Sequence, residues 1–159
     1  MHAAWAFALL LAGSGADKPS TAPRVRAAPT AGRAIEDAAA RSATVRALLD
    51  RLAASDVIVY VEITSMPDVP VARTKLVTAT PVARFLRIGI NSATSVLDRP
   101  ALLAHELQHA LEIAEHREVR DDGGVRRLYA AIGTQHGVDQ FETDAAVRVE
   151  RQVRAELRR

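Results

Sequence analysis

Residues 98–119 read DRPALLAHELQHALEIAEHREV, and this stretch carries both the longest helical pattern and the main polar cluster of the chain. Asp98 can cap a helix that has Pro100 in its first turn and runs to about Val119. His105 and His109 are four residues apart, so both imidazoles lie on one face of this helix, one turn apart. The most apolar side chains lie on the opposite face. The pattern predicts a helix packed on a core, with its histidines turned toward a cleft.

The segment His105-Glu106-Leu107-Gln108-His109 is an H-E-x-x-H pattern. Two neutral imidazoles suit zinc, and they leave room for a third protein ligand and a water. Glu106, beside the first histidine, can take a proton from that water as a general base. The sequence therefore predicts a site for one Zn²⁺ ion, with His105 and His109 as ligands and Glu106 as the catalytic residue.

A zinc site of this kind needs a third ligand, and the chain contains no cysteine to supply it. Glu112 shares the histidine face but lies about 10 Å along the helix axis from His105. Glu115 points away from the histidines if the helix continues. Glu142, on the next long helix, is the best candidate. The alternative for Glu142 is a structural role, because Asp139-x-x-Glu142 fits a capping box.

The flanking segments predict a small α+β domain. Helical or strand periodicity indicates a backing helix over 35–54, strands over 57–63, 75–80 and 84–90, a short helix over 125–132 and a final helix over 139–157. The predicted architecture is thus a backing helix, two or three strands, the H-E-x-x-H helix and then a glutamate-bearing helix.

The 159 residues suffice for one domain of moderate size. Residues 1–16 contain an apolar run followed by small residues, which predicts a signal peptide and an exported (periplasmic or secreted) bacterial protein. A flexible leader is expected over 17–32 and the single domain over 33–159. No apolar run of the mature chain is long enough for a membrane span. The 21 basic residues are interleaved with 19 acidic ones, which argues against a nucleic-acid partner.

The H-E-L-Q-H segment, followed by Glu142 in an E-x-x-A context, resembles the gluzincin class of zinc metallopeptidases. The compact element order over about 35–157 is similar to that of the smallest members, the minigluzincins. The resemblance implies a zincin-like fold, with His105, His109 and Glu142 as zinc ligands and Glu106 as the general base for peptide hydrolysis. It also implies that the strand over 84–90 binds a peptide or protein substrate by strand addition.

One residue departs from the thermolysin-like members of that class, which have an aspartate where this chain has Ala146. In those members the aspartate supports a zinc-ligand histidine. Tyr129 and His136 lie between the two ligand helices and are candidate donors to a transition-state oxyanion.

Two other functional classes remain open from the sequence. One is an exported zinc-binding module of the same fold without turnover, and the other is a structural helical domain without metal. The intact Glu106 favours the peptidase, because a site that only binds metal has no need of this carboxylate.

Overall fold

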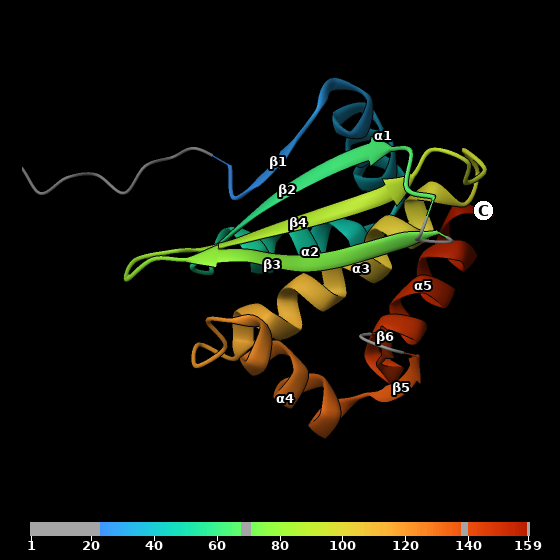
Figure 1. The fold of residues 1–159 in the computed structure, drawn as a ribbon. Coiled ribbons are helices and arrows are strands. Elements are labelled where there is room, and N and C mark those ends of the chain that lie inside the picture. The colour runs from blue at the N-terminus through green and yellow to red at the C-terminus, as the bar shows by residue number, and fades with distance from the viewer. Residues whose placement is uncertain (1–22, 68–70, 138–139, 159) are drawn as a thin grey trace, which may run out of the picture.

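The computed structural model describes residues 23–67, 71–137 and 140–158. Its elements in chain order are β1 (Val25–Ala27), α1 (Pro29–Arg41), α2 (Ala43–Ala53), β2 (Val57–Thr64), β3 (Ala72–Ala79), β4 (Arg84–Asn91), α3 (Arg99–Glu115), α4 (Asp122–Ile132), β5 (Thr134–Gly137), β6 (Gln140–Glu142) and α5 (Asp144–Leu157). A four-stranded sheet carries α1, α2 and α3 on one face, and α5 packs against α3 (Figure 1). The α+β prediction is confirmed, with more strands than expected. Within the described ranges, no helix combines the length and apolar character that crossing a membrane requires.

The sheet has the strand order β1-β2-β4-β3, in which β1, β2 and β4 are parallel and β3 is antiparallel to β4. Strand β4 directs Leu86, Ile88 and Ile90 into the core. The backbone of β4 is paired with β2 on one side and with β3 on the other. The expectation that residues 84–90 bind substrate by strand addition is therefore wrong, and the outer strand next to α3 is β3.

The predicted backing helix over 35–54 is in fact two helices, α1 and α2, which meet at Ser42. The backbone of Ser42 is extended (φ −126°, ψ 120°), and its hydroxyl accepts a hydrogen bond from the Val45 amide at 3.1 Å. A serine in this conformation ends the first helix and caps the second. The apolar periodicity continues across the break because Ala38 and Val45 enter the same core.

The folded part of the chain begins earlier than residue 33. Val25–Ala27 form β1, which pairs with β2, and Pro29 opens α1 with its ring in the first turn. Residues 23–32 of the expected flexible leader thus belong to the domain. The predicted signal peptide over 1–16 lies outside the described residues.

Helix α3 is the centre of the fold, and every residue from Pro100 to Ala114 is buried. It ends at Glu115, with His116 as its cap, rather than at about Val119. The fully buried side chain of Arg84, from the start of β4, holds this end. Its guanidinium donates to the Asp56 carboxylate at 2.6 and 3.0 Å, and to the carbonyl oxygens of Ile113 (2.7 Å), Ala114 (2.9 Å), His116 (2.8 Å) and Val119 (3.2 Å).

The final helix begins later than the predicted residue 139, which is itself outside the described residues. After α4 the chain turns at Gly133 into the β5–β6 hairpin, and α5 starts at Asp144. Gly133 is needed there, because a Cβ would lie 2.9 Å from the carbonyl oxygen of Glu142 and 3.0 Å from that of Tyr129. The hairpin was not predicted because strands of four and three residues are too short to show an alternating pattern.

Helix α5 is tied at its far end to α2. Glu156 accepts hydrogen bonds from the hydroxyls of Ser42 and Thr44, at the N-terminus of α2. Burial by itself raises the pKa of the Glu156 carboxyl, but the hydrogen bonds from Ser42, Gln152 and Thr44 outweigh it and lower the pKa to about 2. A carboxylate at a helix N-terminus is also favoured by the helix dipole.

Candidate metal centre

Three side chains from two parts of the fold converge beside α3. The Nε2 atoms of His105 and His109 are 3.2 Å apart. Glu142 Oε1 lies 3.2 Å from the His105 nitrogen and 3.9 Å from the His109 nitrogen. Among the described residues, no other group of three His, Asp or Glu side chains is placed so that it could hold a metal ion.

The spacing of these three atoms fits a zinc ion. Tetrahedral coordination with bonds of about 2.0–2.1 Å places ligand atoms roughly 3.3–3.4 Å apart. The three observed separations span 3.2 to 3.9 Å. Three protein ligands would leave such an ion one position for a further ligand.

Each histidine is oriented by a carboxylate on its other ring nitrogen. His105 Nδ1 lies 3.0 Å from Glu150 Oε2, and His109 Nδ1 lies 2.9 Å from Glu112 Oε2. A proton on each Nδ1 satisfies these bonds and directs both Nε2 lone pairs at the same point as the Glu142 carboxylate. Glu142 Oε1 also accepts a hydrogen bond from the Thr143 amide at 3.1 Å. Two imidazole lone pairs and a carboxylate that converge in this way repel one another unless a proton or a cation lies between them. The chemistry of the donor set therefore fits a bound metal ion.

The electrostatics of the site are dominated by its carboxylates. Burial opposes a positive charge on His109, but its hydrogen bond to Glu112 and the nearby charges of Glu106 and Glu142 raise its pKa. The same negative potential that stabilises a protonated imidazole stabilises a divalent cation in its place.

Glu142 is the last residue of β6 and does not lie on a helix, contrary to the prediction. The next residue, Thr143, is the N-cap of α5, and its hydroxyl accepts from the Ala146 amide at 3.1 Å. The N-cap of α5 is thus Thr143 and not the expected Asp139, which lies outside the described residues. Part of the structural alternative is confirmed, because Glu142 Oε1 accepts a hydrogen bond from the Thr143 amide at 3.1 Å. The Thr143 hydroxyl also donates to Glu112 at 2.7 Å, which links the start of α5 to the carboxylate that orients His109.

Glu106 is 6% exposed and lies between α3 and the edge strand β3. The Thr74 hydroxyl of β3 donates to Glu106 Oε2 at 2.7 Å. Burial raises the pKa of the Glu106 carboxyl, whereas the charges of His109 and His105 and the hydrogen bond from Thr74 act in the opposite direction. The result is a buried carboxyl group with an increased proton affinity next to the three convergent side chains.

Tyr129 packs against His109. Its hydroxyl donates to the carbonyl oxygen of His109 at 3.1 Å, and its ring meets the His109 ring edge-on at 5.4 Å between centroids. Burial, with the charges of Glu112 and Glu106, raises the pKa of Tyr129 well above its usual value. Service as an oxyanion donor would require the bond to the His109 carbonyl to break. His136 lies in β5, and its side chain is outside the described part of the chain.

Two supporting residues were missed or misread in the sequence. Glu112 is too distant from His105 to serve as a ligand, but its spacing of three residues from His109 is the spacing of neighbours on a helix. Glu150 gave no local signal, because it meets His105 only through the packing of α5 on α3. It provides the carboxylate that Ala146 lacks, one turn further along α5 than Ala146.

Replacement of Glu150 by alanine is expected to lower zinc affinity about 10- to 100-fold, because partners of metal-bound histidines fix their orientation. A competition titration with a chromophoric chelator measures the change. Glu115→Ala is the matched control, since Glu115 lies on α3 but pairs with Arg51 outside the site. Equal zinc affinity in Glu150→Ala and the wild type would contradict the assigned role.

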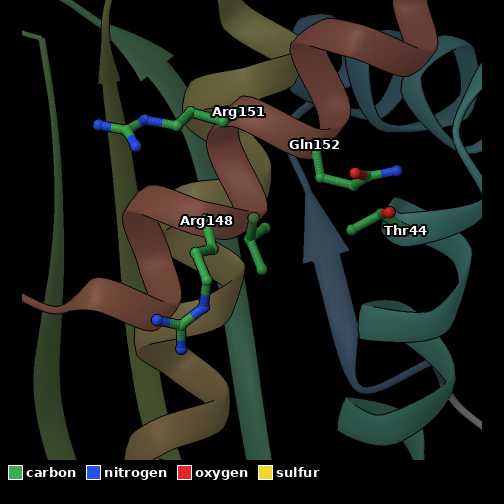
Figure 2. Close-up of a pocket in the computed structure, with 5 residues that line it drawn as sticks. Thr44, Arg148, Arg151 and Gln152 are labelled. Carbon is green, nitrogen blue, oxygen red and sulfur yellow. The ribbon is translucent and has the colours of Figure 1, made fainter.

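A separate hollow of about 440 Å³ lies between α2 and α5, lined by Thr44, Arg148, Val149, Arg151 and Gln152. In Figure 2, Gln152 approaches Thr44, whereas the guanidinium groups of Arg148 and Arg151 point away from Thr44 and from each other. The hollow therefore has no converging set of charged groups, and it contains none of the three convergent ligands.

Comparison with known proteins found no relative of this chain: no family model, no curated protein and no solved structure matches it.

Proposed function

We propose that this chain is a zinc-dependent peptidase in which His105, His109 and Glu142 hold one Zn²⁺ ion and Glu106 acts as the general base. The observation that carries the proposal is the convergence of the three ligand atoms within 3.2–3.9 Å, on the helix that also bears a buried Glu106. These three ligands and the glutamate beside the first histidine resemble the active-site residues of the gluzincin peptidases. A pure binding site does not require a carboxylate at the position of Glu106.

A zinc ion held there supplies Lewis-acid polarisation of a peptide carbonyl and lowers the pKa of a coordinated water to about 7. Thr74 occupies one oxygen of the Glu106 carboxylate, Oε2. The other oxygen, Oε1, accepts the proton from the attacking water, and Glu106 then delivers this proton to the leaving amine. The burial of Glu106 raises its proton affinity and so favours the transfer.

The outer edge of β3 is the surface for the substrate backbone. This edge lies beside α3, and Thr74 joins the two elements through Glu106. An extended peptide added to β3 gains main-chain hydrogen bonds and passes in front of the site. The predicted signal peptide over 1–16, with its apolar run, is consistent with export of such an enzyme from the cell.

Metal dependence tests the function directly. We expect the protein to hydrolyse unfolded peptides when loaded with one equivalent of zinc, to lose the activity on chelation and to regain it with zinc but not with Mg²⁺ or Ca²⁺, which prefer oxygen ligands. A quenched-fluorescence peptide library is a suitable substrate. Stoichiometric zinc without hydrolysis of any library member would contradict the peptidase and identify a zinc-binding module.

A further inference from the structure

The face of the sheet opposite the helices is basic along its outer edge. The strand register places Arg26, Tyr60, Arg87 and Lys75 in one row across the four strands. The next row contains Glu62, Gly89 and Arg73. In β3, Arg73 and Lys75 are exposed, whereas Leu76 is buried on the opposite face.

Ion pairing on the exposed face of the sheet leaves the outer strand β3 positively charged. Arg87 of β4 pairs with Glu62 of β2, and its Nε donates to Glu62 Oε1 at 2.8 Å. Among the described residues, no ion pair involves the two cations of the outer strand, Arg73 and Lys75. Two exposed positive charges, two residues apart, therefore line β3, whose outer edge pairs with no other strand in the described part of the chain.

The position of Thr74 between them sets the geometry of such a peptide. Thr74 points toward α3, since its hydroxyl binds Glu106. Residues directly opposite each other on neighbouring strands point to the same face of the sheet. In a peptide paired with β3, the residue opposite Thr74 faces the metal helix, and the residues on either side of it face Arg73 and Lys75.

We propose that the substrates are peptides with two acidic residues spaced two positions apart, paired with Arg73 and Lys75 on the outer edge of β3. This proposal rests on the proposed peptidase function and assigns its substrate class. Opposite charges placed directly across two strands stabilise the pairing, and like charges destabilise it. The overall basic balance of the chain, with a pI near 9.5, also favours encounter with acidic partners.

The test compares two labelled peptides that differ only in a Glu-x-Glu or a Gln-x-Gln segment. Binding is measured by fluorescence anisotropy on the zinc-loaded Glu106→Gln variant, and kcat/KM is measured on the wild type. We expect the acidic peptide to be preferred about two- to thirtyfold, from two cross-strand charge pairs. The preference should weaken at about 1 M salt, where the screening length falls to about 3 Å.

The variant Arg73→Glu/Lys75→Glu should reverse the order of the two peptides in the binding assay. Arg33→Glu/Arg46→Glu makes the same change of net charge on α1 and α2, away from the β3 edge, and should leave the preference as in the wild type. Equal binding of both peptides to the parent protein, or an unchanged order after the reversal at β3, would overturn the proposal. Tighter binding of a single-stranded dT oligonucleotide than of the acidic peptide would also overturn it.

These outcomes are separable from failure of the peptidase function. Preferential binding of the acidic peptide without cleavage by the zinc-loaded wild type would remove the enzyme proposal and support the acidic-peptide surface. Cleavage of both peptides at equal rates, with equal affinities, would support the enzyme and overturn the substrate class.

Discussion

Replacement of Glu106 by glutamine should lower kcat for peptide hydrolysis about 10²- to 10⁴-fold while leaving one zinc ion bound per chain. Glutamine has the shape of glutamate, and its side-chain oxygen can still accept the hydrogen bond that Thr74 donates in the wild type. It cannot accept the proton of the attacking water at neutral pH. The variant therefore separates metal binding from proton transfer.

Two measurements check this expectation on the same sample. Zinc content by atomic absorption reports the site, and hydrolysis of a quenched-fluorescence peptide reports the chemistry. Glu115→Gln makes the same change on the same helix at an exposed residue outside the site, and it should keep full activity. Undiminished hydrolysis by Glu106→Gln would remove Glu106 from the role of general base.

The second large effect concerns stability, and it is expected at Arg84. Arg84→Met should reduce the free energy of unfolding by about 3–5 kcal/mol, the usual cost of breaking a buried ion pair by removing one partner. The change leaves the last carbonyl groups of α3 without their donor and leaves Asp56 without its counter-charge. Urea denaturation followed by circular dichroism measures the loss.

Arg87→Met is the matched control, because Arg87 lies three residues further along the same strand with an exposed side chain. Its surface pair with Glu62 should contribute about 0–1 kcal/mol. The hydrogen bonds from Arg84 hold the pKa of Asp56 below its usual value. The stabilisation is thus present above the usual pKa of aspartate, and it is lost as the pH falls through the lower, folded-state pKa. Equal stability of the two variants would contradict a special role for Arg84.

The pairing of His105 and His109 on α3 could be predicted because helical geometry alone brings residues i and i+4 together. Glu142 could be predicted to join them, because Glu112 and Glu115 are badly placed on the same helix and the chain has no cysteine. Its position at the end of a short strand could not, since the β5–β6 hairpin has only a few residues and forms through tertiary contacts.

The remaining parts of the site depend on contacts between distant segments. Glu150 reaches His105 across the interface of α5 and α3, and Thr74 reaches Glu106 from β3. The order of the strands is likewise a long-range property, which is why residues 84–90 were expected at the edge but lie in the interior. The contact of Glu112 with His109 follows from their spacing of three residues on one helix, and a carboxylate too distant to bind the ion can still orient this histidine.

The most direct test of the central claim is the zinc content of protein purified without chelator, for the wild type beside His109→Ala. The variant removes one of the three converging ligand atoms and leaves His105 and Glu142 in place. We predict about one zinc ion per wild-type chain and a loss of stoichiometric zinc from the folded variant. The absence of stoichiometric metal from the wild type, even after zinc is added, would contradict the metal centre and reduce the H-E-x-x-H pattern to a structural cluster.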